Sequence, residues 1–225
     1  RIPSACSRLG VKCQPKMGFC DGEYRYVPVK LLDVAGLVKD AHKGRGLGNQ
    51  FLDDLRRSDV NIVVIDASGG TDEDGNPVPP GTHDPLEDVK IVTEEFTHWL
   101  ASIIEKHWSR IAGQVRIKRQ KLEDALHQIL AGMNIKRSHI AAALKNLDVS
   151  ISTMPDAEKL LELSRRILKI SKPLVVAANK MDILEARKNY ERIREALKPI
   201  PVIPVSAEAE LILRKASSIG LIEYY

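Results

Sequence analysis

The stretch PLVVAANKMD, residues 173–182, joins a short apolar run rich in β-branched residues directly to an Asn-Lys-Met-Asp segment. Three similar apolar runs occur at 26–32 (YVPVKLL), 61–65 (NIVVI) and 201–205 (PVIPV). Most of them alternate with helix-like segments, at 48–57, 186–197 and 207–219. Short apolar strands that alternate with helices are typical of a parallel sheet buried on both faces. The sequence therefore predicts an open α/β fold with a mostly parallel sheet flanked by helices.

Polar segments follow the predicted strands at the point where each strand ends. They are Asp-Val-Ala-Gly at 33–36, Asp-Ala-Ser-Gly at 66–69, Asn-Lys-Met-Asp at 179–182 and Ser-Ala-Glu at 206–208. Ligands of open α/β folds bind beyond the carboxyl ends of the strands. We therefore expect these four segments to converge on one crevice.

The chemistry of two of these segments suits recognition of guanine. The carboxylate of Asp182 can accept two hydrogen bonds from adjacent N–H donors on one base edge, while the Asn179 amide orients the loop. The aliphatic stem of Lys180 can cover the flat face of the ring. A backbone N–H near Ala207 can reach the base carbonyl. A solvated loop is the alternative for an Asn-Lys-x-Asp segment alone. The predicted nucleotide-binding residues here are Asn179, Lys180, Met181, Asp182, Ser206, Ala207 and Glu208.

The first polar segment suits a metal ion and a terminal phosphate. Asp33 is positioned to hold Mg²⁺ through water, because Mg²⁺ keeps much of its hydration shell and binds few protein carboxylates. Gly36 can offer its N–H to a phosphate with no side chain in the way. Glycines at 44, 46 and 48 would let the next segment change conformation when that phosphate leaves. A plain surface turn is the alternative for these glycines.

The middle of the chain, residues 84–170, lacks strand patterns and is predicted to be an inserted helical domain. Asp84 can cap a long helix that Pro85 begins. Shorter amphipathic stretches follow at 122–130, 138–147 and 156–170. Residues 1–83 and 171–225 would then form the sheet domain. The long helix should bury one face, which carries Val89, Val92, Phe96, Leu100, Ile103, His107 and Ile111.

The predicted insert is also strongly basic. The whole chain has a net charge of +4, but residues 106–145 hold nine Lys or Arg against two acids, a local net charge of +7. Such a patch is typical of RNA binding, with solvated helix faces as the alternative. The candidates that cluster most closely are Arg116, Lys118, Arg119 and Lys121.

Composition limits the other function classes. The chain has 225 residues, of which 44% are hydrophobic and 28% charged, as in globular proteins. No stretch approaches the roughly 18 apolar residues of a membrane span, so we expect a cytoplasmic protein that does not bind membranes. The three cysteines, Cys6, Cys13 and Cys20, are spaced too widely for the usual zinc pairs, and reduced thiols are expected. We expect no binding to DNA.

Together these motifs resemble the YchF subfamily of Obg-related GTPases, and most closely its archaeal members. The resemblance rests on DVAGLVKDAHKGRGLGNQFLDDLRRSD, DASG, HDPLEDV, NKMD and SAEAE, and it covers essentially the whole chain. It implies a P-loop GTPase fold, hydrolysis of GTP with Mg²⁺, an inserted helical domain and association with the ribosome. Some relatives alter the NKxD motif and prefer ATP. Because Asn179 and Asp182 are kept, guanine is favoured here.

Two features depart from this pattern. Leu37 stands where Ras-like enzymes place a glutamine that orients water, so hydrolysis should be slow or assisted. His42 and His83 are the remaining catalytic candidates. The chain also contains no G-x-x-x-x-G-K-S/T phosphate loop. We expect that it is truncated at both ends, without the P-loop and a C-terminal TGS domain, and that this fragment alone is inactive.

Two functions remain open on the sequence alone. One is a GTPase switch that binds GTP and GDP and contacts the ribosome or its RNA. The other is a ribosome-associated or RNA-binding scaffold with little or no nucleotide turnover.

Overall fold

The computed structural model describes residues 2–11, 14–34, 58–149 and 153–224, which form two compact units, Arg1–Asp33 and Val34–Tyr225. The first unit is a small antiparallel sheet of β1 (Ile2–Pro3), β2 (Phe19–Cys20) and β3 (Tyr24–Tyr26), in the order β1-β3-β2, with the short helix α1 (Cys6–Leu9). The sulfurs of Cys6 and Cys20 lie 3.9 Å apart as free thiols, as predicted, whereas Cys13 lies outside the described residues.

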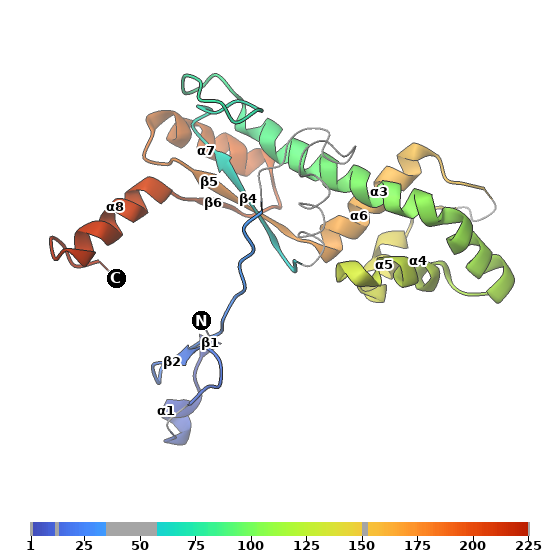
Figure 1. Cartoon of the computed structure of the whole chain (residues 1–225), viewed down its shortest axis with the longest axis horizontal. Helices are drawn as coiled ribbons and strands as arrows, with labels where there is room; N and C mark the ends of the chain where they lie inside the picture. Colours follow the sequence, from blue (N-terminus) through green and yellow to red (C-terminus); the bar gives the residue numbers. More distant parts are fainter. Residues whose placement is uncertain (1, 12–13, 35–57, 150–152, 225) are drawn as a thin grey trace. The chain divides into compact units, whose positions relative to one another are not determined.

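The second unit contains a parallel sheet in the order β4-β5-β6 (Figure 1). Its strands are β4 (Asn61–Asp66), β5 (Leu174–Asn179) and β6 (Val202–Pro204). All three match apolar runs of the sequence, so the α/β fold class is confirmed.

The predicted strand at 26–32 is wrong. The antiparallel strand β3 ends at Tyr26, and residues 27–34 form no strand. Val29 and Leu31 are each 78% exposed. An apolar run becomes a strand only where a neighbour supplies hydrogen-bond partners, and Pro28 itself has no N–H to donate. Among the described residues, no neighbouring strand pairs with residues 27–34. The hydrophobic pattern alone could not show this.

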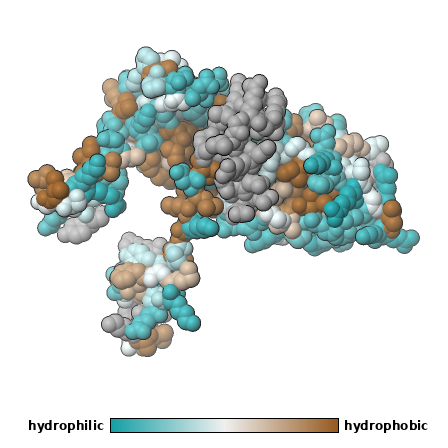
Figure 2. Space-filling model, in the orientation of Figure 1, coloured by the Kyte–Doolittle hydropathy of each residue, from teal (hydrophilic) through white to brown (hydrophobic). Residues whose placement is uncertain are grey.

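One face of the parallel sheet packs against two helices. These are α7 (Leu184–Ala196) and the first turns of α3 (Pro85–Lys118). The core between them contains Ile65, Val89, Val176, Ala178, Ala186 and Ile193. On the other face Ile62 and Val64 are 58% and 64% exposed, and hydrophobic side chains gather there in Figure 2. The last helix, α8 (Ala207–Ser218), follows β6 and buries none of its residues.

A second core lies among helices. It is formed by α3, α4 (Leu122–Leu130), α5 (Arg137–Leu144) and α6 (Ala157–Ser171), with a short 3₁₀ turn at Ala131–Met133. Asp84 caps α3 as predicted, because its Oδ1 accepts a hydrogen bond of 3.1 Å from the Leu86 N–H. The helices match the stretches predicted for residues 84–170, although the proposed domain boundaries stay a prediction.

The buried stripe of α3 differs from the predicted one over its second half. Ile104 and Trp108 are buried, with exposed fractions of 0% and 4%, whereas Ile103 and His107 are only partly buried. Steps of four residues from Leu100 lead to Ile104 and Trp108, and the indole N–H of Trp108 donates to the Thr153 carbonyl at 3.2 Å. Among the described residues, no helix has the length and apolar character needed to cross a bilayer.

We expect Ile111→Ala to lower the free energy of unfolding by about 2–5 kcal/mol, because it leaves a cavity in the helical core. Ile111 is 0% exposed. Ile117→Ala is the matched control, since Ile117 lies in the same helix but is 84% exposed, and its effect should stay within about 0.5 kcal/mol. Urea unfolding followed by circular dichroism measures both. Equal effects would contradict the assignment of this core.

Candidate functional site

The polar segments after β4, β5 and β6 meet at the carboxyl edge of the parallel sheet. In the ladder of β4 and β5, Asp66 lies opposite Asn179. The pairing continues past the strand ends, because the Ala67 N–H donates to the Asn179 carbonyl at 3.1 Å. On the β6 side, the Val205 N–H donates to the Ala178 carbonyl at 2.9 Å. The Met181 N–H in turn donates to the Val205 carbonyl at 3.1 Å. Three of the four predicted segments are therefore brought together.

Asn179 links the loop after β5 to the beginning of α8. Its side-chain Oδ1 accepts a hydrogen bond of 3.0 Å from the Ala207 N–H. This bond uses the amide oxygen and leaves the amide NH₂ as the donor that Asn179 can present to a ligand. The side chain thus orients its loop, as the sequence predicts.

Asp182 and Ser206 form a second link between the same two loops. The Ser206 hydroxyl donates to Asp182 Oδ1 at 2.5 Å, and Ser206 Oγ accepts from the Ala209 N–H at 3.3 Å, which caps α8. The hydrogen bond from Ser206 lowers the pKa of Asp182. Asp182 is exposed, so an ionised carboxylate faces solvent beside the N-terminus of α8.

Lys180 is held by a residue to which the sequence analysis gave no binding role. Its ammonium lies 2.8 Å from Asp66 Oδ2, and its backbone adopts a left-handed conformation with φ of 65°. Burial raises the pKa of Asp66, but hydrogen bonds from Lys180, Ser68 and Thr71 lower it to about 2. Because this is below the ordinary 3.8, the carboxylate stabilises the fold above that pH and loses this effect as the pH falls toward 2.

The loop between β4 and α3 is fixed by its own hydrogen bonds. The N–H groups of Val78, Gly81 and His83 donate to the carbonyls of Gly70, Ser68 and Gly69 at 2.8–3.1 Å. Gly69 has φ of 64°, and a Cβ there would lie 2.2 Å from the His83 carbonyl oxygen, so only glycine fits. The loop is thus irregular, as expected, but backbone hydrogen bonds within it fix its conformation.

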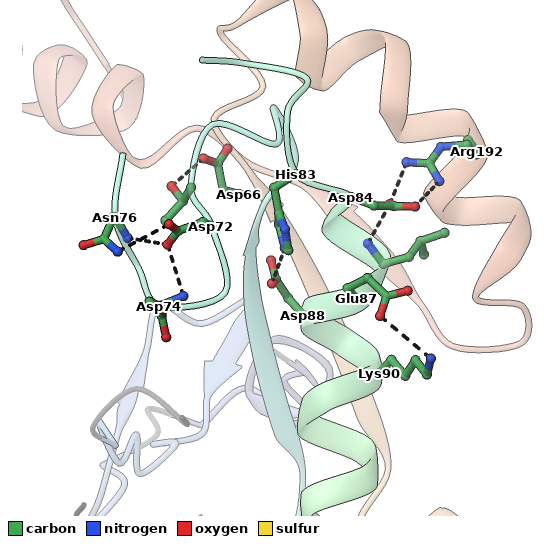
Figure 3. A network of polar contacts seen from close by, with 12 residues as sticks. Asp66, Asp72, Asp74, Asn76, His83, Asp84, Glu87, Asp88, Lys90 and Arg192 are labelled. Carbon is green, nitrogen blue, oxygen red and sulfur yellow. Dashed lines mark hydrogen bonds and ion pairs between the residues drawn. The ribbon is translucent and has the colours of Figure 1, made fainter. Parts of the chain in front are cut away.

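The end of this loop is anchored to two helices (Figure 3). His83 Nε2 lies 2.8 Å from Asp88 Oδ1 in α3, and burial raises the pKa of Asp88. The Arg192 guanidinium of α7 binds both carboxylate oxygens of Asp84, at 2.8 Å and 3.0 Å. These contacts give His83 a structural partner, and its catalytic role stays a prediction.

The other predicted site residues either take no part in the hydrogen bonds above or lie outside the described residues. Met181 lies in the loop after β5 and packs against the sheet core, and Glu208 lies in the first turn of α8. Asp33 is exposed at the end of the first unit. Gly36, Leu37 and His42 lie outside the described residues, as do the glycines at 44, 46 and 48.

The predicted RNA-binding residues surround the junction of α3 and α4. Arg116 and Lys118 occupy the last turn of α3, Arg119 is its C-cap residue, and Lys121 precedes α4. All four side chains are exposed. The two acids of this region, Glu123 and Asp124, both pair with Arg137. They are therefore already partly neutralised by a different basic residue.

The part of the chain that contains these loops also matches a known protein family. Residues 177–225 match the family model described as "Obg-like GTPase YGR210-like, G4 motif-containing domain". The resemblance to Obg-related GTP-binding proteins is confirmed. The matched Obg-like segment begins within β5 and contains the whole cross-linked pair of loops, from Asn179 to Ala207.

Relatives extend the similarity over the rest of the chain. The "Uncharacterized GTP-binding protein MJ1332" of Methanocaldococcus jannaschii is 44% identical over 98% of this chain and 55% of its own length. The "Ribosome-binding ATPase YchF" of Bacillus subtilis is 28% identical over 79% of this chain and 47% of its own. A crystal structure of a GTP-binding protein from Pyrococcus horikoshii is 33% identical, with a TM-score of 0.75 over 95% of this chain and 58% of that one. The chain thus spans about half the length of the relatives that it matches.

We expect Ser206→Ala to have two effects, because Ser206 both caps α8 and donates to Asp182. Loss of the cap should cost about 0.5–2 kcal/mol of stability, measured by urea unfolding. Loss of the donor should raise the pKa of Asp182 toward its ordinary value, measured by NMR titration of the carboxyl carbon. Ser218→Ala is the control, because Ser218 lies in the same helix and its hydroxyl donates to the Lys215 carbonyl of that helix. An unchanged pKa of Asp182 in Ser206→Ala would contradict the link.

Proposed function

We propose that this protein binds GTP and hydrolyses it with Mg²⁺, and that it acts as a ribosome-associated switch in the cytoplasm. One observation carries the guanine assignment. The Asn179 and Asp182 side chains are bonded to Ala207 and Ser206, at 3.0 Å and 2.5 Å, so two separate loops present one polar surface at the carboxyl edge of the sheet. The family match to an Obg-like G4 motif supports the same assignment.

The direction of hydrogen bonding explains why guanine would be preferred over adenine. The ionised carboxylate of Asp182 can only accept hydrogen bonds. Guanine offers two adjacent N–H donors on its edge, whereas adenine offers an acceptor at the equivalent ring nitrogen. Placing adenine there would leave two acceptors facing each other, and an unsatisfied pair of this kind is costly. The Asn179 NH₂ group and the N-terminus of α8 would contact the rest of the base.

Asp33 fits the predicted role in holding Mg²⁺. Its side chain is exposed, and Mg²⁺ prefers one or two carboxylates together with water and phosphate oxygens. When bound, the ion would neutralise charge on the phosphates. Leu37 would leave hydrolysis slow or dependent on a partner.

A preference for ATP is the nearest alternative. It is favoured by the name of the B. subtilis relative, a ribosome-binding ATPase, which is 28% identical to this chain. The M. jannaschii relative, 44% identical, is named a GTP-binding protein. The intact Asn179–Asp182 segment supports GTP.

The exposed basic junction of α3 and α4 and the name of the YchF relative support a ribosomal partner. Phosphate backbones attract such surfaces without base-specific contacts. A scaffold that binds the ribosome or RNA with little nucleotide turnover would use the same junction. Nucleotide binding therefore separates the two functions, and RNA binding does not.

We expect Asp182→Ala in the full-length protein to weaken binding of GTP and GDP by at least about tenfold, because a charged acceptor of two hydrogen bonds is lost. Titration of fluorescent GTP, GDP and ATP in the presence of Mg²⁺ measures this. Asp148→Ala, another exposed aspartate, should bind as the wild type does. Unchanged GTP affinity in Asp182→Ala would overturn the guanine assignment. Tighter binding of ATP than of GTP by the wild type would favour the ATPase alternative.

Charge reversal at Arg116, Lys118, Arg119 and Lys121 is expected to weaken binding to ribosomes and to flatten its salt dependence, since fewer counterions are released. Sedimentation with ribosomes at several salt concentrations measures both effects. The control reverses the same number of exposed charges elsewhere, at Lys159, Lys169, Lys188 and Lys215. If both variants lose affinity equally, net charge alone explains the binding and the junction has no special role.

A further inference from the structure

Asp66 has a buried carboxylate, and most of the hydrogen bonds described for it come from the loop that follows β4. Its side chain is only 8% exposed. Oδ1 accepts from the Ser68 N–H at 3.0 Å and from the Ser68 hydroxyl at 2.6 Å, and Oδ2 accepts from the Thr71 hydroxyl at 2.7 Å. A further partner, the Lys180 ammonium at 2.8 Å, comes from a loop 114 residues away. A carboxylate buried to this extent requires such partners.

The sheet register sets the distance between Asp66 and Lys180. Asp66 lies opposite Asn179 in the last pair of the parallel ladder, so Lys180, the first residue after β5, lies next to the end of β4. The left-handed φ of 65° at Lys180 then bends the chain, and the Ile183 N–H closes the turn on the Lys180 carbonyl at 2.9 Å. A residue with a Cβ adopts this conformation at a cost in free energy, and the surrounding contacts offset that cost.

The Lys180 side chain is fixed at its ammonium end but is not fully buried. The ammonium is fixed by Asp66 and also lies 3.3 Å from the Thr71 hydroxyl, whereas the side chain as a whole is still 42% exposed. The stem therefore joins a fixed charge to the Asn179–Asp182 backbone within a side chain that is partly open to solvent. Without Asp66, the ammonium would move freely and the stem would lose its defined position, at an entropic cost to any ligand that packs on it.

We propose that Asp66 is a positioning residue for nucleotide binding, which acts by holding Lys180 so that the lysine stem forms a preset face for the base. This inference rests on the proposed function. It assigns a role to the Asp-Ala-Ser-Gly segment after β4. Because the contact concerns the base side of the site, Asp66 should affect GTP and GDP equally.

Asp66→Asn in the full-length protein is expected to weaken GTP and GDP binding by about tenfold each, the size of one charge-assisted hydrogen bond. Lys180→Met should have a similar effect. In the double variant, the loss should be no greater than in the larger single variant, because Asp66 acts through Lys180. Asp74→Asn is the matched control, since Asp74 is an exposed aspartate of the same loop.

The outcomes are distinct. If the two single losses multiply in the double variant, Asp66 has only a structural role and the inference is overturned. A loss for GTP that exceeds the loss for GDP would also overturn it, because the effect would then concern the phosphates. If the wild type binds no guanine nucleotide, the proposed function itself fails. Wild-type binding with an unaffected Asp66→Asn variant removes only the role of Asp66.

A second variant protects the test against misfolding. Urea unfolding shows whether Asp66→Asn keeps its fold, and if it does not, Thr71→Val takes its place in the cycle with Lys180→Met. Thr71 contacts both Asp66 and Lys180, so its substitution should weaken GTP and GDP binding equally, by about two- to fivefold. Equal affinity of Thr71→Val and the wild type, or losses that multiply with Lys180→Met, would contradict the proposal.

Discussion

The parallel pairing of β4 with β5 is the constraint on which the rest of this site depends. It places Asp66 opposite Asn179, and the bond from the Ala67 N–H to the Asn179 carbonyl continues the ladder beyond the strands. A shift of one residue would turn every side chain of a strand to the other face. The same shift would remove Ile65 from the core that it shares with Val176. The hydrophobic core and the polar edge therefore specify the same register, and the site needs no separate element to align it.

Three different hydrogen bonds hold the loops of this edge together. An amide oxygen accepts from a backbone N–H, a carboxylate accepts from a hydroxyl, and a second carboxylate accepts from an ammonium group. The first two reach the beginning of α8, a helix that buries none of its residues. Because α8 gains so little from burial, its cap and its bonds to Asn179 and Asp182 matter more for its position. Asn179 and Asp182, the residues proposed to recognise the base, are thus also bonded to the beginning of this helix.

Much of this arrangement could be predicted from the sequence, for physical reasons that differ by element. The strands β4, β5 and β6 were recognisable because a buried parallel strand is a short β-branched run, and α3 because Asp84 and Pro85 mark its start. The strand at 26–32 was wrong because pairing depends on a neighbour, which an apolar pattern cannot reveal. Ile104 and Trp108 were missed in favour of Ile103 and His107, because both pairs have helical spacing from Leu100. The Asp66–Lys180 contact joins residues 114 positions apart and follows only from the strand register.

The site is also connected to the basic junction of α3 and α4 by continuous contacts. The loop that holds Lys180 through Asp66 and Thr71 ends at His83, which contacts Asp88 in α3, while Asp84 is fixed to α7 by Arg192. From there α3 runs for 34 residues to Arg116 and Lys118. At 1.5 Å per residue this helix is about 50 Å long, so a rotation of about 5° at its first turn would move its far end by about 4 Å. The His83 and Asp84 contacts therefore help to fix the direction of the helix that carries the basic surface, together with the core in which α3 packs against α4, α5 and α6.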